Sequence, residues 1–209
     1  MTSAEVQLSP RAARTRAALV AAGFELLAER PIDAIAIDDI VARAGVAKGS
    51  FFNHFTDKAG FAAELGAAVR RELELLVDSA NAGVTDPAAR LAGGMRVALE
   101  FALAERKRCI VMLRGLELST GLGPQLNRGI HADIEALVAA GLARPEAQRG
   151  GVRFWLGLCQ ILQLGAVERE LPRSDAAERL REMLVLGLTG LGVPEDRALY
   201  TARQVAAQL

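Results

Sequence analysis

The stretch "AGVAKGSFFNHFTDKAGF", residues 44–61, gathers the side chains of this sequence that are best suited to bind another molecule. Lysine ammonium groups pair with phosphate oxygens, and serine, asparagine and histidine side chains hydrogen-bond to phosphates and to the edges of nucleic acid bases. The candidates in this stretch are Lys48, Gly49, Ser50, Asn53, His54 and Lys58. They can act together only if one structural element presents them together.

The other residues that often do chemistry lack the spacing that metal binding or catalysis needs. No set of Cys, His or carboxylate residues with metal-ligand spacing surrounds His54. Cys109 and Cys159 are far apart, and we interpret them as small buried hydrophobic residues in a reducing compartment. His131 and Glu135 share a helical face, but the sequence has no paired E-x-x-H motif, no nucleophile elbow and no glycine loop that would cradle phosphate. We therefore expect no catalytic residues, no metal site and no cofactor.

Two short helices around Gly45 would position the polar candidates. Apolar residues at i, i+3, i+4 and i+7 predict a first helix that Gly45 ends, and a second short helix is expected over 48–54. Phe51 and Phe55 are four residues apart, so they lie on one face of the second helix and are predicted core residues. The apolar set predicted to hold the pair together is Ile37, Ile40, Val41, Ala44, Val46, Phe51 and Phe55. This pattern describes a helix–turn–helix whose outer face carries the polar candidates and Phe52, as a helix entering the DNA major groove requires.

The composition of the whole chain predicts helices throughout. Of 209 residues, 51% are apolar, and alanine, leucine, glutamate and arginine predominate over β-branched and aromatic residues. A helix is expected over 10–30, and a long one from a cap at Thr56 or Asp57 to about Asn81. Further helices are expected over 87–105, 107–117, 124–140, 145–169 and 174–190, with a short one from Glu195.

Charge and hydropathy over the whole chain give no support to binding of nucleic acid or to insertion in a membrane. The formal net charge is zero, which offers no global attraction to nucleic acid or to an anionic membrane. The most apolar segment, 152–167, is shorter than a membrane span and contains Arg153, so we expect no membrane helix. The first residues contain no apolar signal segment, and we expect a cytoplasmic location.

The helix–turn–helix pattern belongs to a longer match. "TRAALVAAGFELLAERP" followed by "IDDIVARAGVAKGSFFNHFTDKAGF" resembles the N-terminal DNA-binding region of the TetR family of bacterial transcriptional regulators, over about residues 15–65. The resemblance implies an all-α fold. It implies a three-helix helix–turn–helix DNA-binding domain at 1–56, followed by a larger helical domain for effector binding and dimerisation at 57–209.

The DNA contacts that the resemblance implies involve eight residues. They are Lys48, Gly49, Ser50, Phe52, Asn53, His54, Lys58 and Thr15, with further phosphate contacts expected from Arg11, Arg14 and Arg16. Ala36 and Ala47 stand where family members usually have Thr and Ser, so side-chain caps are missing from both helices of the motif. Phe52 replaces a tyrosine whose hydroxyl usually donates to a DNA phosphate. Over residues 1–60 seven basic residues balance seven acidic ones, so the DNA interpretation depends on the motif and not on charge.

The resemblance also implies a homodimer and an effector cavity. The dimer would form through the helices near 145–169 and 174–190, whose surplus apolar surface independently favours a partner. Candidate lining residues are Met95, Phe101, Met112, Leu116, Trp155, Cys159 and Leu162, with Arg114, Gln160 and Gln163 as polar contacts. Apolar residues at helical spacing are also typical of plain core. Gly93-Gly94, inside a predicted helix, indicates either close packing or a kink beside a cavity, or a tolerated weak point.

These observations lead to one hypothesis and two alternatives. The hypothesis is a ligand-responsive transcriptional regulator, with repression expected, that binds near-palindromic double-stranded operator DNA as a homodimer and responds to a small-molecule effector. The alternatives are a helical small-molecule-binding or interaction protein that does not bind DNA, and a helical enzyme.

Overall fold

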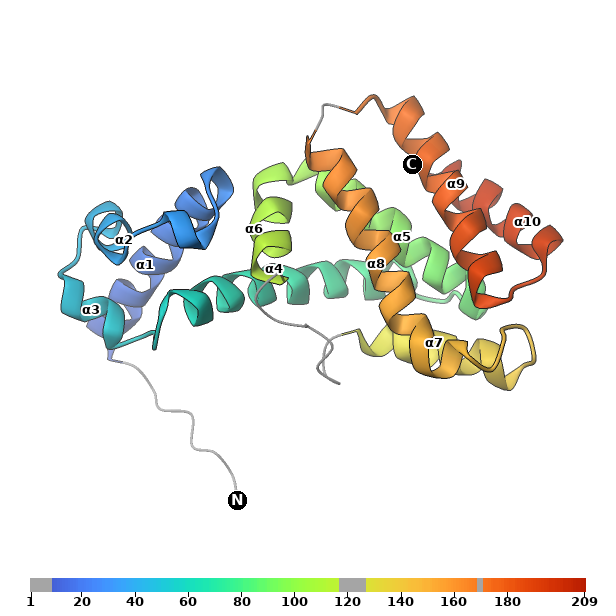
Figure 1. Ribbon diagram of the computed structural model, residues 1–209, viewed down its shortest axis with the longest axis horizontal. Helices are drawn as coiled ribbons and strands as arrows, with labels where there is room; N and C mark the ends of the chain where they lie inside the picture. Colours follow the sequence, from blue (N-terminus) through green and yellow to red (C-terminus); the bar gives the residue numbers. More distant parts are fainter. Residues whose placement is uncertain (1–8, 117–126, 169–170) are drawn as a thin grey trace, which may run out of the picture. The chain divides into compact units, whose positions relative to one another are not determined.

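The computed structural model describes residues 9–116, 127–168 and 171–209, and all regular structure within these ranges is helical (Figure 1). The predicted all-α fold is confirmed. The elements are α1 (Pro10–Glu29), the short 3-10 helix η1 (Ile32–Ala34), α2 (Ile37–Ala44), α3 (Lys48–Phe52), α4 (Lys58–Ala80), α5 (Pro87–Ala104), α6 (Arg106–Leu116), α7 (Arg128–Ala139), α8 (Ala147–Glu168), α9 (Arg173–Leu191) and α10 (Glu195–Ala206). Each predicted helix has a counterpart, although positions 117, 124–126 and 169 of the predicted helices lie outside the described residues.

The chain divides into two compact units. The first unit takes its described residues from 1–68 and 110–119, and the second takes its described residues from 69–109 and 120–209. The predicted boundary at residue 56 precedes α4, whereas the first turns of α4 belong to the first unit. The reason is burial, because Phe61, Ala62 and Leu65 from these turns are part of the core of the first unit.

In the first unit, α2 and α3 form the predicted helix–turn–helix. Gly45 follows α2 with a φ of 67°, a left-handed conformation that glycine adopts without strain. The N–H groups of Gly45 and Val46 donate to the carbonyl oxygens of Ala42 and Val41, at 3.2 and 3.0 Å. These bonds close α2 and set the direction in which the chain enters α3.

The core of the first unit contains the aromatic rings that follow this turn. Phe51 is fully buried, and its ring centroid lies 5.5 Å from that of Phe55 and 5.4 Å from that of Phe61. Phe55 is buried as well, so the prediction that Phe51 and Phe55 are core residues is confirmed. Gly23 on α1 lies against the Phe61 ring, where a Cβ atom would clash, so glycine is required for this approach.

The helix ends of the first unit follow the predicted capping chemistry. Asp57 caps α4, because its Oδ1 accepts the Gly60 N–H at 2.7 Å. The turn that leads to this cap ends α3 at Phe52, two residues before the predicted end at 54. Ala36 and Ala47 provide no side-chain cap, as predicted. For α2 the Asp39 carboxylate compensates in part, because its Oδ2 accepts the Ala36 N–H at 3.3 Å.

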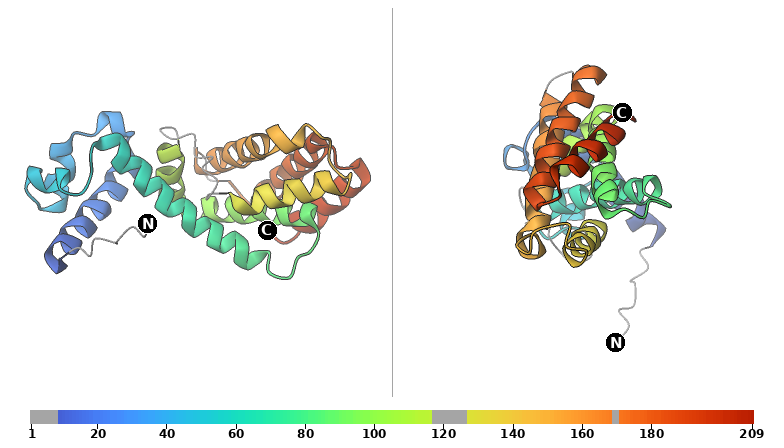
Figure 2. Two further views of the ribbon diagram at one scale, coloured as in Figure 1. Left: turned by 90° about the horizontal axis from the view of Figure 1, so that it is seen from below. Right: turned by 90° about the vertical axis from the view of Figure 1, so that its right-hand side faces the viewer.

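The second unit is built around α5, which packs against α7, α8, α9 and α10 (Figures 1 and 2). Gly93 and Gly94 allow α4 to pass close to α5. A Cβ atom on Gly93 would lie 2.5 Å from Oδ1 of Asn81, and one on Gly94 would lie 3.3 Å from Cγ1 of Val77. These short distances support the close-packing alternative for the two glycines. Within the described ranges, no helix combines the length and the apolar character that crossing a membrane requires.

Candidate nucleic-acid interface and ligand cavity

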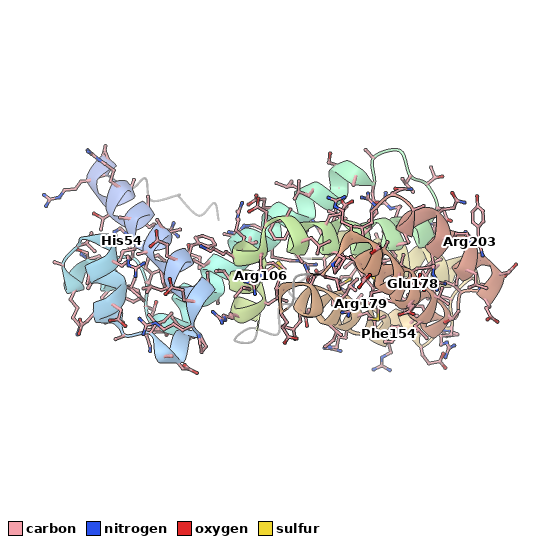
Figure 3. All side chains as sticks on the ribbon, turned by 90° about the horizontal axis from the view of Figure 1, so that it is seen from above. His54, Arg106, Phe154, Glu178, Arg179 and Arg203 are labelled. Atoms are coloured by element: carbon pink, nitrogen blue, oxygen red, sulfur yellow. The ribbon has the colours of Figure 1, made fainter. Side chains whose placement is uncertain are left out.

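Most of the predicted DNA-binding residues lie on α3 and the turn that follows it (Figure 3). Those exposed to solvent are Lys48, Gly49, Phe52 and Asn53, and those half-buried are Ser50 and His54, with Thr15 half-buried on α1. Phe52 is 54% exposed, and its ring meets that of Phe51 in an edge-to-face contact with centroids 5.5 Å apart. A short helix held by one buried ring thus presents a second ring and several hydrogen-bonding groups outward.

The lysines of this region already have partners within the first unit. The Lys48 ammonium lies 2.9 Å from Oδ1 of Asp38 in an exposed ion pair. Such pairs contribute about 0–1 kcal/mol, so a phosphate can replace the carboxylate at little cost. Lys58 donates to the carbonyl oxygens of Ile32 and Ile35, at 3.3 and 2.7 Å. These bonds hold the loop around η1 to the start of α4, a structural role that the sequence analysis missed.

The arginines of α1 differ in their availability for phosphate contacts. Arg16 forms an ion pair with Glu64, and its guanidinium lies 5.4 Å from the centroid of the Phe55 ring. Arg14 donates to the Pro10 carbonyl at 3.3 Å on the surface of its own helix. Arg16 is therefore held inside the unit, whereas Arg11 and Arg14 are exposed.

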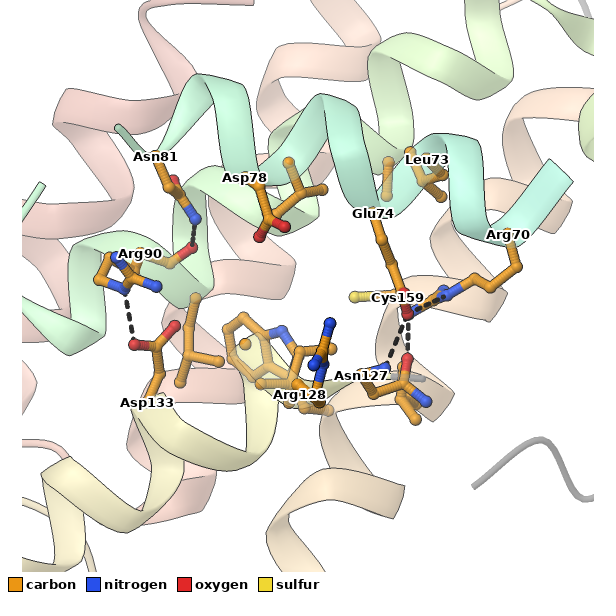
Figure 4. A pocket seen from close by; sticks show the side chains of 18 residues that line it. Arg70, Leu73, Glu74, Asp78, Asn81, Arg90, Asn127, Arg128, Asp133 and Cys159 are labelled. Carbon is orange, nitrogen blue, oxygen red and sulfur yellow. Dashed lines mark hydrogen bonds and ion pairs between the residues drawn. The ribbon is translucent and has the colours of Figure 1, made fainter. Parts of the chain in front are cut away.

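A cavity of about 90 Å³ lies in the second unit, between α4, α5, α7 and α8 (Figure 4). Its apolar wall is formed by Leu73, Val77, Leu91, Gly94, Ala98, Gly129, Ile130, Trp155, Leu156 and Cys159. Its polar wall is formed by Arg70, Glu74, Asp78, Asn81, Arg90, Asn127, Arg128 and Asp133. This combination of an apolar surface with a few charged groups is typical of small-molecule sites.

One part of the polar wall joins α4 to the start of α7 (Figure 4). Glu74 accepts the backbone N–H of Asn127 at 2.7 Å, and its carboxylate lies 3.4 Å from Nε of Arg70. The Arg70 guanidinium also donates to the side-chain oxygen of Asn127. Asn127 has a φ of 69°, and this network holds it in that uncommon conformation.

A second part of the polar wall joins α5 to α7. Arg90 donates from Nε to Oδ1 of Asp133 at 2.7 Å, and Asn81 donates to the Arg90 carbonyl at 2.9 Å. Burial raises the pKa of Asp133, and the Arg90 guanidinium opposes that shift. The pair therefore holds the Asp133 carboxyl group in a fixed position beside the cavity.

Of the residues predicted to contact an effector, Trp155 and Cys159 line this cavity. The others that can be placed do not: Met95, Phe101 and Leu162 are buried core residues, Gln163 donates to the Ala98 carbonyl at 3.2 Å, and Met112 and Arg114 belong to the first unit. Arg114 donates to the Leu27 carbonyl at the end of α1. The side chain of Leu116 lies outside the described residues.

The polar contacts predicted from the sequence, Arg114, Gln160 and Gln163, are not part of this polar wall. Arg70, Glu74 and Asp78 recur every four residues on α4, which places them on one helical face. Such a row is usually a solvated surface, but here it borders a cavity. The four-residue spacing of these three charged residues is the sequence feature from which the polar wall could have been predicted.

The buried cysteines have no reactive character in this structure. Burial raises the pKa of both Cys109 and Cys159 to about 12, so each is a protonated thiol at neutral pH. Within the part of the chain that the structure describes, no three His, Cys, Asp or Glu side chains are grouped as ligands of a metal ion would be.

Solved structures with the same fold cover nearly the whole chain. The crystal structure of RolR in complex with resorcinol has a TM-score of 0.61 and 21% sequence identity, over 92% of this chain and 94% of RolR. The structure of AibR in complex with isovaleryl coenzyme A and operator DNA has a TM-score of 0.59 and 18% identity, over 81% of this chain and 95% of AibR. At these identities the likeness shows a shared fold.

Sequence comparisons match the helix–turn–helix region and about half of one relative. Transcriptional regulator AcuR of Cereibacter sphaeroides is 34% identical over 113 residues, which are 53% of this chain and 52% of AcuR. The match thus spans about half the length of AcuR. Residues 19–65 match the model of the bacterial regulatory proteins of the tetR family. None of these relatives is described as an enzyme, and the predicted resemblance is confirmed over residues 19–65, which match the bacterial regulatory proteins of the tetR family.

Proposed function

We propose that the protein is a ligand-responsive transcriptional repressor that binds near-palindromic operator DNA as a homodimer. The observation that carries the proposal is the exposed face of α3, where Lys48, Phe52 and Asn53 project from the family's helix–turn–helix. The printed descriptions of AcuR as a transcriptional regulator and of AibR in complex with operator DNA support it. This function requires access to the chromosome, so we infer a cytoplasmic location.

The balanced charge of residues 1–60 bears on how the first unit would bind DNA. Because basic and acidic residues are equal in number over residues 1–60, attraction depends on local placement. Binding must displace Asp38 from Lys48, and Phe52 offers no hydroxyl to a phosphate. We therefore infer that two recognition helices, about 34–36 Å apart on one side of the duplex, are needed for useful affinity.

A second copy of the chain is the partner that the exposed apolar side chains of α8 and α9 favour. Phe154, Ile161 and Leu164 on α8 are 42%, 64% and 42% exposed, and Leu186 on α9 is 63% exposed. Phe154 (labelled in Figure 3) lies against Gly190 of α9, where a Cβ atom would be 2.6 Å from Cζ of its ring. The two exposed faces are therefore continuous, as the surface of a four-helix interface must be.

The cavity in the second unit supports the ligand-responsive part of the proposal. An effector that binds one conformation of the dimer better than another shifts the population toward that conformation. By linkage, the effector must weaken operator binding by the same factor by which the operator weakens effector binding. Unequal factors in paired titrations would contradict this two-state account.

The experiment that tests DNA recognition selects bound sequences from a random pool of duplexes. We expect two inverted half-sites, with centres one helical turn apart or a multiple of it. Asn53→Ala should then weaken binding to the selected site by roughly tenfold, because one base or phosphate contact is lost. Lys107→Ala, which removes an exposed charge from α6, is the control and should change affinity little. A failure to enrich any sequence would favour the alternative of a helical interaction protein that does not bind DNA.

The experiment that tests the dimer compares two aspartate substitutions at similarly exposed positions. Ile161→Asp places a charge on the α8 and α9 face, whereas Leu75→Asp places one on α4, where Leu75 is 69% exposed. We expect Ile161→Asp to produce monomers by light scattering and to lose DNA binding, and Leu75→Asp to remain dimeric. A dimer that is indifferent to Ile161→Asp would show that the interface lies elsewhere.

A further inference from the structure

The cavity in the second unit is balanced in charge, which restricts the ligands it can take. Three cationic side chains line it, those of Arg70, Arg90 and Arg128, and three anionic ones, those of Glu74, Asp78 and Asp133. A ligand with a net charge would meet as many repulsive as attractive groups. The lining therefore favours a ligand without net charge. This inference rests on the proposed function, since it concerns the effector of the same site.

Most of the charged groups in the cavity are already paired. Glu74 is bound by Arg70 and by the Asn127 N–H, and Asp133 is bound by Arg90. These groups also hold α7 to α4 and α5, so a ligand that recruited them would break contacts that shape the cavity. These paired residues therefore hold the helices around the cavity in place, and their charges are compensated within the protein.

Asp78 and Arg128 are the exceptions within the described ranges, since the side chain of neither forms a hydrogen bond or an ion pair there. Figure 4 shows Asp78 pointing from α4 toward the cavity and Arg128 at the start of α7 across from it. Both residues are exposed, which places them where the cavity meets solvent. The site therefore offers one free negative charge and one free positive charge on opposite walls.

Backbone N–H groups and an aromatic ring line the cavity together with the Arg128 and Asp78 side chains, and they favour ligand groups of opposite charge. Arg128, Gly129 and Ile130 form the first turn of α7 and line the cavity. No side chain caps this helix, and the backbone N–H groups of a first turn favour a carboxylate. The buried indole of Trp155 also lines the cavity, and an aromatic face can bind a cationic group.

The size of the cavity limits the ligand further. About 90 Å³ is smaller than the roughly 150 Å³ of a protein cavity that takes up benzene. A bulky acyl or nucleotide conjugate does not fit without rearrangement, whereas a compact molecule with a few carbon atoms between its charged ends does.

From these observations we propose that the effector is a small zwitterion, with its carboxylate at Arg128 and the first turn of α7 and its ammonium group at Asp78. The class includes short amino acids and their quaternary ammonium relatives. The methylene groups between the charges lie against Leu73, Val77 and Ile130. A purely anionic ligand provides no partner of opposite charge for Asp78, and a purely cationic ligand provides none for Arg128.

The first test measures binding to the full chain by calorimetry in the absence of DNA. The probes are glycine, 3-aminopropionate, 4-aminobutyrate and trimethylammonioacetate, with butyrate, butylamine and butanol as analogues of 4-aminobutyrate that lack one or both charges. We expect at least one zwitterion to bind about tenfold more tightly than any analogue that lacks a charge. If no zwitterion binds, or if butanol binds as well as the best zwitterion, the proposal is overturned.

The second test assigns each end of the ligand with single substitutions. Asp78→Asn should weaken binding of the best zwitterion about five- to tenfold and leave butyrate binding unchanged or improved. Arg128→Gln should weaken zwitterion and butyrate binding and spare butylamine. The control variants Asp196→Asn and Arg71→Gln remove exposed charges that do not line the cavity, and should bind every probe as the unmodified chain does. Equal effects of test and control variants would overturn the assignment.

DNA binding is measured separately, so that the two proposals can fail independently. A zwitterion that binds with the expected pattern but leaves DNA affinity unchanged supports the ligand class and contradicts ligand-responsive regulation. An operator complex released only by molecules outside this class supports regulation and contradicts the ligand class.

Discussion

Replacing Phe51 by alanine should unfold the first unit while the second unit stays folded. Phe51 is fully buried, and its ring packs against those of Phe55 and Phe61 in the core of the first unit. α3 has only five residues, which is too short to be stable without tertiary contacts. The buried ring is what attaches this helix to the rest of the unit.

The expected loss follows from the area and the contacts of the ring. A buried aromatic side chain removes about 150–250 Å² from water, and about 25 cal/mol per Å² gives roughly 4–6 kcal/mol for the whole side chain. Alanine retains a small part of this, and measured Phe→Ala changes in protein cores are about 3–5 kcal/mol. Domains are typically stable by about 5–15 kcal/mol, so this substitution removes much of the stability of the first unit.

Hydrogen exchange followed by mass spectrometry resolves the two units and can test this prediction. We expect Phe51→Ala to lose protection in α1, α2 and α3 but to keep it in α5, α9 and α10. Phe52→Ala is the matched control, because Phe52 is 54% exposed and its removal should cost about 1 kcal/mol or less. Equal protection in Phe51→Ala and the unmodified chain would refute the assignment of Phe51 as the residue that holds α3.

Three further predictions concern single side chains or atoms. Phe52→Tyr should tighten binding to operator and random DNA alike by about 0.5–1.5 kcal/mol, measured by fluorescence anisotropy, because its hydroxyl regains a phosphate contact. Gly115→Ala should destabilise the first unit by about 1–3 kcal/mol in calorimetry, since its Cβ would lie 2.8 Å from Cα of Gly66. Gly150→Ala, with open space around the new Cβ, should instead stabilise the chain by about 0.5–1 kcal/mol. Cys109 and Cys159 should resist thiol reagents in the native state. Because their pKa is about 12 when folded and near 9.0 when unfolded, stability should fall as pH rises from 9 toward 12. Stability that is constant over this range would show that the thiols are not buried as described.

The helix–turn–helix could be predicted from the sequence because its determinants are local. Gly45 must adopt a positive φ, Phe51 and Phe55 are one helical turn apart, and Asp57 caps the next helix. Each of these features is decided by residues within four positions of one another. The same holds for the start of α5, where Asp86 accepts the Ala88 N–H at 3.0 Å ahead of Pro87.

The end of the first unit could not be predicted in this way, because contacts between distant segments determine it. Gly66 on α4 and Gly115 on α6 touch backbone to backbone, and a Cβ on Gly66 would lie 2.9 Å from Cα of Gly115. Val111, also on α6, joins the core of the first unit. Nothing in the local sequence of either helix indicates that two glycines 49 positions apart meet. The boundary predicted at residue 56 therefore leaves out the turns of α4 that contact α6.

The cavity could not be predicted from the sequence for a different reason. A cavity is a space that no side chain fills, and the sequence pattern does not indicate where such a space remains. Periodicity identifies the residues that a helix buries, and Met95, Phe101 and Leu162 are indeed buried, but each fills space against its neighbours. The open space lies where polar side chains join α7 to α4 and α5, through the hydrogen bond of Glu74 with the Asn127 N–H and the ion pair of Arg90 with Asp133. Charged side chains are long and need several polar partners, so they hold helices apart where apolar side chains would let them close. A row of charges that faces inward on a helix is therefore a better sign of a ligand site than an apolar stripe.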